Sequence, residues 1–279
     1  MDPNAIYGKS HEISLAALPL SLGELATAAS ILGFGGVLGL DEWFAGRSRD
    51  EISSLAEEAA QSLRERGLLD QHADGSLSLD PWLAMLVETA ARAPRVLVLS
   101  VAHLSGDERR HIVHLGETMI VEQTDLDAQR QSLANVPDLD VLGEQLVEHL
   151  GTPERPAAPG PRFQVPASEM TEARALAQEP ERCSETFQKA GLPPETAAAL
   201  TAALQNDGAW GSASVMRRGE SDGGETVQVT LESTQAWLSG QQGSWLVRST
   251  GEQGEFLQLV PSSHAQILAR IVQMLAGEN

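Results

Sequence analysis

One pattern near the C-terminus constrains the fold more than any other stretch of the chain. Between residues 226 and 275, three short runs of alternating, β-branched or aromatic residues (TVQVTLES, GSWLVRST and EFLQLVPS) are separated by glycine-bearing turns, and SHAQILARIVQML then follows a helical period. The pattern predicts three strands and a closing helix. The same order occurs earlier, where PRVLVLSVAH, RRHIVHLG and ETMIVEQTD predict strands and LDVLGEQLVEHL predicts an amphipathic helix. We therefore predict two related α/β halves.

Prolines separate the two halves. The run GTPERPAAPGPRFQVP, residues 151–166, contains five of the fourteen prolines. Because proline cannot continue a helix or donate to a sheet, we interpret this run as a stiff connector. The predicted organisation is an N-terminal α/β half over residues 1–150, the proline-rich connector over 151–166, and a C-terminal α/β half over 167–279. The expected fold class is α/β, with an antiparallel sheet and flanking helices in each half and a quasi-two-fold relation between them.

The segment before the first predicted sheet has the element order of a winged helix. Ser21 with Glu24, and Ser48 with Glu51, have the spacing of capping boxes that begin helices, and LLDQHADGSLSLD predicts a hairpin with its turn at residues 74–75. A DNA reader would need basic residues here. Instead the region sets Asp50, Glu51, Glu57, Glu58, Asp70, Asp74 and Asp80 against Arg47, Arg49, Arg64 and Arg66. This excess of acidic residues favours a winged helix that packs against protein over one that binds DNA.

The overall charge excludes nucleic acid as an expected partner. The formal net charge is -20 and the pI is about 4.6, a field that repels phosphate backbones and attracts basic protein surfaces. Cys183 is the single cysteine, so no intrachain disulfide can form; we interpret it as a small buried or half-exposed residue. The first residues lack the pattern of a signal peptide, and no apolar run is long enough to cross a bilayer. We expect a cytosolic protein without membrane insertion.

No motif in the chain carries recognisable chemistry. Walker A, G-x-S-x-G, H-E-x-x-H and EF-hand patterns are absent, and the glycine-rich run GFGGVLG has Leu38 where a dinucleotide fingerprint requires glycine. His111 and His114 are the histidines closest in sequence, but three residues apart on a strand they point to opposite faces and cannot chelate one metal. We predict no catalysis, no cofactor and no metal.

Two predicted hairpin loops occupy equivalent places in the two halves. LSGDERR (residues 104–110) and RRGESDGGE (residues 217–225) each combine acidic residues with an Arg-Arg pair. Loops on a rigid sheet vary without disturbing the core, so recognition is often built there. The candidate partner-binding residues from these loops are Leu104, Asp107, Glu108, Arg109, Arg110, Arg217 and Arg218.

Several stretches together resemble a known family. SLGELATAASILGF, EEAAQSLRERGLL, ADGSLSLDPWLAMLVETAARAPRVLVLS, GSWLVRS and LVPSSHAQILARIVQML resemble the EspG-type chaperones of type VII (ESX) secretion systems. The resemblance implies a quasi-two-fold fold that binds PE-PPE secretion substrates in the cytosol and keeps them soluble for export. By layout, it also implies partner contacts from the 104–110 loop and from helices around Thr186 to Asn206, which adds Phe187 to the candidates.

The leading hypothesis is a cytosolic, non-catalytic chaperone that recognises a helical, PE-PPE-like secretion substrate. Two alternatives remain open from sequence: a transcriptional regulator that uses the winged helix, and an enzyme of unrecognised type. The sequence leaves open the identity of the client, the oligomeric state and whether the two sheets merge.

Overall fold

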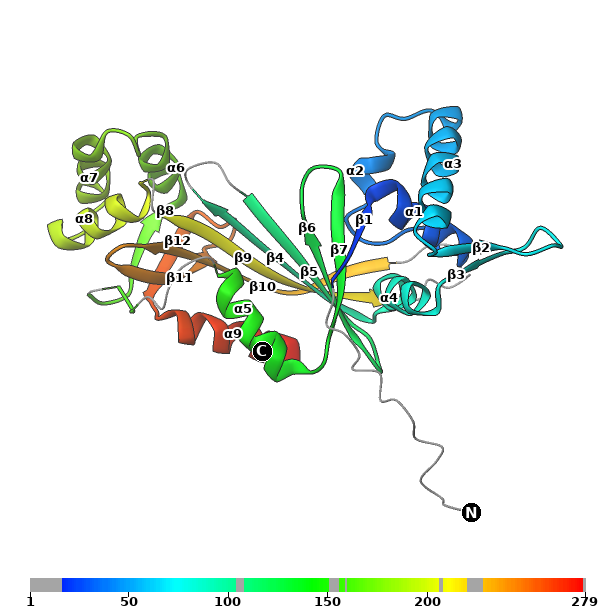
Figure 1. The fold of residues 1–279 in the computed structure, drawn as a ribbon. Helices are drawn as coiled ribbons and strands as arrows, with labels where there is room; N and C mark the ends of the chain where they lie inside the picture. The colour runs from blue at the N-terminus through cyan, green and yellow to red at the C-terminus, as the bar shows by residue number, and fades with distance from the viewer. Residues whose placement is uncertain are drawn as a thin grey trace, which may run out of the picture. The chain divides into compact units, whose positions relative to one another are not determined.

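The computed structural model describes residues 17–103, 108–150, 156–158, 160–205, 208–219 and 228–277. The chain divides into two compact units. Unit 1 comprises Met1–Ala93 and Gly116–Pro137, and unit 2 comprises Pro94–Leu115 and Asp138–Asn279. Each unit combines helices with antiparallel strands, so the predicted α/β class is confirmed (Figure 1). The bounds of the two units differ from those of the two predicted halves. The division of the chain at residues 151–166 stays a prediction from the repeated sequence pattern.

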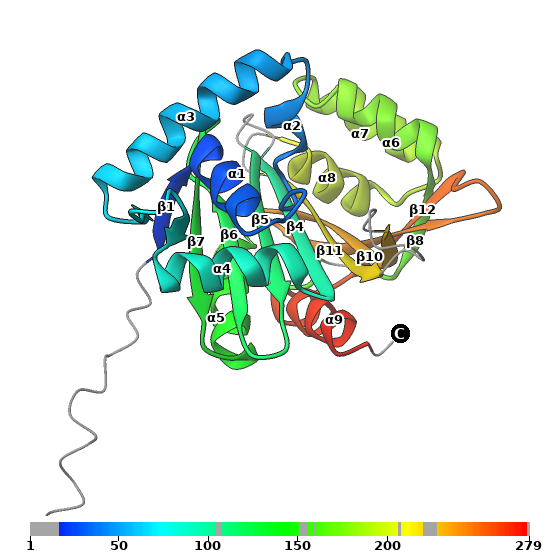
Figure 2. The ribbon, with the colours of Figure 1, turned by 90° about the vertical axis from the view of Figure 1, so that its right-hand side faces the viewer.

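Unit 1 places helices beside a short antiparallel sheet. Its elements are β1 (Leu18–Ser21), α1 (Leu22–Ile31), α2 (Asp41–Phe44), α3 (Arg49–Glu65), β2 (Leu69–Gln71), β3 (Leu77–Leu79), α4 (Pro81–Arg92), β6 (Ile120–Asp125) and β7 (Arg130–Val136). The strand order is β1-β7-β6, and β2 with β3 forms a separate hairpin. Helix α4 packs on β6 and β7, and α1 packs on α3 and α4 (Figure 2).

Both predicted capping boxes form in unit 1. The Ser21 hydroxyl accepts from the Glu24 backbone N–H at 3.0 Å, and the Glu24 carboxylate accepts from the Ser21 N–H at 2.7 Å. Ser48 and Glu51 repeat the arrangement at the start of α3. The hairpin turn at residues 74–75 is also confirmed, since Gly75 takes a left-handed φ of 84° between β2 and β3. The winged-helix interpretation of these elements stays untested.

The glycine-rich segment, residues 33–39, is tied to the sheet of unit 1. Val37 is buried in the core of the unit. The Leu38 carbonyl accepts from the Gln123 side-chain amide at 3.0 Å, and the same amide donates to the Gln131 side chain at 2.8 Å. These bonds satisfy two buried glutamines and hold the segment in place. The segment therefore packs as part of the core of unit 1.

Unit 2 is built on a longer antiparallel sheet. Its elements are β4 (Arg95–His103), β5 (Glu108–Leu115), α5 (Leu139–His149), β8 (Phe163–Pro166), α6 (Ala167–Ala175), α7 (Pro180–Lys189), α8 (Pro194–Ala203), β9 (Ala209–Gly219), β10 (Gln228–Gly240), β11 (Gly243–Thr250), β12 (Phe256–Pro261) and α9 (His264–Ala276). The strand order within the unit is β5-β4-β9-β10-β11-β12-β8. Helices α5 and α9 pack together, and α9 contacts β9 and β10.

The predicted strand runs and both closing helices are confirmed. The first set corresponds to β4, β5, β6 and α5, and the second to β10, β11, β12 and α9. In sequence, each half ends with four strands and a helix: β7 follows the three strands of the first set, and β9 precedes those of the second. The quasi-two-fold relation between the halves stays a prediction.

The end of the predicted connector contains a strand. Residues 163–166 form β8, which pairs with β12 from Phe256 to Leu259. A strand that contains proline is tolerated because β8 lies at the edge of the sheet and needs donors on one side only. Upstream, the Ala158 N–H donates to the Ser244 carbonyl at 3.1 Å. The connector is therefore attached to the sheet that it was expected only to precede.

An arginine holds the end of α9 on the sheet of unit 2. Arg95 bonds to the Glu232 carboxylate at 2.9 Å and donates to the carbonyls of Met274 and Leu275 at 3.1 and 2.6 Å. Glu232 lies at a register shift in β10 and also pairs with Arg217. Burial raises the pKa of Glu232, but the two arginines outweigh this and lower it overall.

We expect Arg95→Ala to lower the free energy of unfolding by about 2 kcal/mol, because it removes charge-assisted bonds from a half-buried carboxylate and from two helix-end carbonyls. Urea denaturation measures this. Hydrogen exchange should accelerate in the last turn of α9. Arg182→Ala, which removes an exposed pair with Glu179, serves as the control and should leave stability nearly unchanged. Equal effects of the two variants would contradict the assignment.

Candidate partner-binding surface

The register of the sheet places the start of β5 and the end of α8 at the same end of unit 2. Ala102 in β4 pairs with Glu108 of β5 on one side, and His103 pairs with Ala209, the first residue of β9, on the other. Helix α8 ends six residues before β9, at Ala203. Segments far apart in sequence, both expected to contact a partner, therefore lie at the same end of the strands.

The first predicted loop is described only in part. Leu104 and Asp107 lie outside the described residues. Glu108 and Arg109 are exposed at the start of β5, and Arg110 is half-buried. Because successive side chains on a strand point to opposite faces, Arg109 lies on the face opposite to Glu108 and Arg110. The exposed pair Glu108 and Arg109 is the part of this loop available to a partner.

The second predicted arginine pair lies at the other end of the sheet. Arg217 pairs with Arg95 at the first residue of β4, whereas Glu108 pairs with Ala102 near the last. Seven residues of strand separate these positions, about 23 Å at 3.3 Å per residue. Arg217 shares the carboxylate that Arg95 binds, and Arg218 is half-buried, where burial lowers the pKa of its guanidinium. The two loops are equivalent in sequence, but the structure does not bring them together.

Phe187 belongs to the core. Its side chain is fully buried with Cys183 in a cluster that joins α6, α7 and α8 to the sheet. The two residues are four apart, so they share the inward face of α7. Burial also raises the pKa of the Cys183 thiol, and the prediction of a buried cysteine is confirmed. The assignment of Phe187 to partner contact does not fit this position, and we do not carry it forward.

The outward face of α7 carries exposed side chains that the sequence analysis did not name as candidates for partner contact. They are spaced opposite to the buried stripe and are Glu181, Arg182, Glu185, Gln188 and Lys189. Glu195 and Ala198 continue the exposed surface onto α8. The hydrophobic spacing of Cys183 and Phe187 was the signal that could have identified this face. With Glu108, the surface has acidic side chains interspersed with a few basic ones.

Rigid packing supports this surface. Helix α7 packs between α6 and α8, and α8 packs on β10 (Figures 1 and 2). Gly240 of β10 lets the backbone of α8 approach closely, because a Cβ there would lie 2.5 Å from the Cα of Ala203. A surface held in this way is preorganised for binding.

The described residues offer no metal site. In the parts of the chain that the structure describes, no three His, Cys, Asp or Glu side chains gather closely enough to hold a metal ion. His111 and His114 are buried on β5, opposite Leu99 and Val96 of β4, and point to opposite faces of the strand. Within the same described ranges, the helices are too short or too polar to span a bilayer.

The family model described as the EspG family matches residues 21–273. The chain belongs to the EspG family. A solved structure of the Mycobacterium tuberculosis type VII secretion system chaperone EspG5, in complex with a PE25-PPE41 dimer, has a similar fold. The TM-score is 0.63 at 15% sequence identity, over 93% of this EspG-family chain and 96% of the EspG5 chain. No curated protein sequence matches this chain. The predicted family resemblance is confirmed.

Proposed function

We propose that this EspG-family chain is a non-catalytic chaperone that binds a helical PE-PPE-type heterodimer and keeps it soluble for type VII secretion. One observation carries the proposal: the chain belongs to the EspG family and shares its fold, over nearly its whole length, with an EspG5 chaperone solved in complex with a PE-PPE dimer. The activity is stoichiometric binding in the cytosol, before export, and not turnover.

We place the contact on the surface formed by the start of β5 and the outer faces of α7 and α8. The register brings the start of β5 and the end of α8 to one end of the sheet, and α7 packs on α8. The outward side chains of these elements are exposed and mostly charged. Opposite charges on a partner would steer the encounter and fix its orientation. Leu104 and Asp107 stay predicted contacts of the same surface. Arg217 and Arg218 are left out because they lie at the opposite end of β9.

Charge reversals test the surface. The chain is co-expressed with PE-PPE pairs encoded in the same genome, and the affinity of the purified complex is measured by calorimetry. We expect Glu108→Arg and Glu185→Arg each to weaken binding by about tenfold, because each places a like charge against the partner.

Glu252→Arg is the matched control. This exposed carboxylate lies in the turn between β11 and β12, at the far end of β11 from Gly243. We expect the Glu252→Arg variant to bind the PE-PPE pair with the same affinity as the unchanged chain. A complex that forms but responds alike to all three reversals would move the contact elsewhere on the protein.

A further inference from the structure

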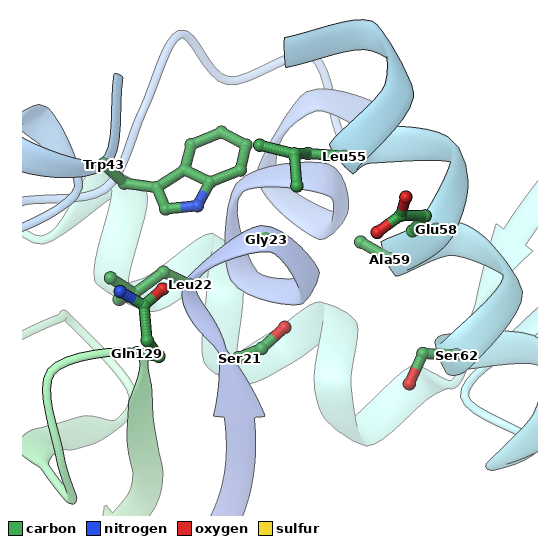
Figure 3. Close-up of a pocket in the computed structure, with 9 residues that line it drawn as sticks. All are labelled: Ser21, Leu22, Gly23, Trp43, Leu55, Glu58, Ala59, Ser62 and Gln129. Atoms are coloured by element: carbon green, nitrogen blue, oxygen red, sulfur yellow. The ribbon is translucent and has the colours of Figure 1, made fainter. Parts of the chain in front are cut away.

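Unit 1 contains a pocket that the proposed function does not use. Its volume is about 290 Å³, near the lower end of the range of roughly 300 to 1,000 Å³ found for small-molecule sites. The pocket opens between the start of α1, Trp43 of α2 and one side of α3 (Figure 3). It is lined by Ser21, Leu22, Gly23, Trp43, Leu55, Glu58, Ala59, Ser62 and Gln129.

The floor of the pocket exists because residue 23 is glycine. A Cβ at Gly23 would lie 3.5 Å from the Cβ of Ala59 and 3.6 Å from the Trp43 ring, which are ordinary contact distances. A methyl group would therefore fill the floor without displacing its neighbours. Trp43 and Leu55 both line the pocket with apolar side chains (Figure 3). This part of the pocket suits an aliphatic chain.

Two polar side chains of the pocket have no partner among the described residues. The Ser21 hydroxyl already accepts from the Glu24 N–H, and the Ser62 hydroxyl donates to the Glu24 carboxylate at 2.9 Å. No hydrogen bond or ion pair within the described ranges engages the carboxylate of Glu58 or the side-chain amide of Gln129. Figure 3 shows these two side chains on opposite sides of Gly23. They are the groups left for a ligand.

The charge around the pocket favours a cation. Glu58 lies on α3, where the exposed side chains Asp50, Glu51, Glu57, Glu58 and Glu65 outnumber the exposed Arg49 and Arg64, in a chain of net charge -20. An anionic ligand would be repelled. The Trp43 ring already binds one cation of this chain, since the guanidinium carbon of Arg47 lies 5.5 Å from its centroid; Arg47 itself does not line the pocket. The site thus combines an apolar floor, an aromatic wall and an unpaired carboxylate.

We propose that this pocket receives an arginine side chain presented by a partner protein. The aliphatic stem would lie on Gly23 and Ala59, against Trp43 and Leu55. The guanidinium would bond to Glu58. Arginine fits better than lysine because its planar fork donates in several directions and stacks on aromatic rings. The proposal is independent of the surface on β5, α7 and α8.

The test uses the full chain and N-acetyl-L-argininamide as the probe, followed by ¹H–¹⁵N NMR. We expect saturable shifts at the amides of Gly23 and Ala59 and at the Trp43 indole N–H. Glu58→Gln removes the charge and Gly23→Ala fills the floor, and each should weaken binding by about tenfold. Glu57→Gln, which removes a neighbouring exposed carboxylate outside the pocket, should bind like the unchanged chain. Circular dichroism verifies that the variants are folded.

Three results would overturn the proposal. The first is an absence of saturable shifts at these positions. The second is equal binding of the uncharged analogue N-acetylnorleucinamide, or binding that survives both pocket variants. The third is tighter binding of putrescine, which would assign the pocket to a free polyamine. None of these results would affect capture of a PE-PPE pair, so the two proposals fail separately.

Discussion

Replacing Arg66 with alanine is expected to lower the free energy of unfolding by about 2 to 3 kcal/mol, because a buried carboxylate loses its counter-charge. Glu24 in α1 is only 3% exposed. One guanidinium nitrogen of Arg66 lies 2.9 Å from each carboxylate oxygen of Glu24, and a second donates to the Pro19 carbonyl at 2.7 Å. Arg66 therefore joins the end of α3 to the start of α1. Arg64→Ala, two residues away, is the control. Within the described residues, the Arg64 side chain donates to the side chain of the exposed Gln61.

The Arg66 effect should depend on pH. Burial raises the pKa of Glu24, but the Ser21 N–H, the Ser62 hydroxyl and Arg66 outweigh burial, so the pKa lies below its usual value of 4.5. A lowered folded-state pKa adds stability above the unfolded-state pKa and loses it as pH falls through the folded-state value. Urea denaturation should show the full penalty of Arg66→Ala at pH 7, and the penalty should shrink as the pH falls through the folded-state pKa of Glu24. A penalty that does not change with pH would contradict this explanation.

Gly240→Ala is expected to cost about 3 kcal/mol, at the upper end of the range for overpacking, because the obstacle is backbone. A Cβ at this position of β10 would lie 2.5 Å from both Cα and Cβ of Ala203. The helix backbone cannot rotate away as a side chain would, so α8 must move off the sheet. Since α8 carries part of the proposed surface, binding of a PE-PPE pair should weaken as well.

Thermal unfolding and calorimetry with the partner measure both effects of Gly240→Ala. Gly36→Ala is the matched control, because a Cβ there meets nothing within 4 Å and the backbone does not require glycine. Its stability and its affinity should be nearly unchanged. If Gly240→Ala behaves like Gly36→Ala, close packing of α8 on β10 is not what positions the surface.

Local signals were sufficient for most elements. The alternating runs of β4, β11 and β12 and the helical period of α9 depend on neighbouring residues, and so do the capping boxes of α1 and α3. Strand β7 was missed because Gln131 and Ser132 are polar and yet buried. Their partners, such as Gln123 on β6, lie elsewhere in the sequence, so the pattern of β7 does not show a buried strand.

The sequence does not show which candidate residues lie close together, because that depends on tertiary structure. Both loops with an Arg-Arg pair are turns between strands, but only the register of β4 with its neighbours shows that they lie at opposite ends of the sheet. For Phe187 a local signal existed: its spacing from Cys183 indicated an inward face on α7. The layout of the family directed attention to the correct helices, and helical periodicity would have selected the outward side chains.

The most direct test of the account is the mass and affinity of the complex between this chain and a PE-PPE pair from the same genome. Light scattering on the purified, co-expressed proteins would give the mass, and calorimetry would give the affinity. We expect one copy of the chain per PE-PPE heterodimer, and weaker binding for Glu108→Arg and Glu185→Arg but not for Glu252→Arg. Failure of every such pair to form a stoichiometric complex would contradict the chaperone function.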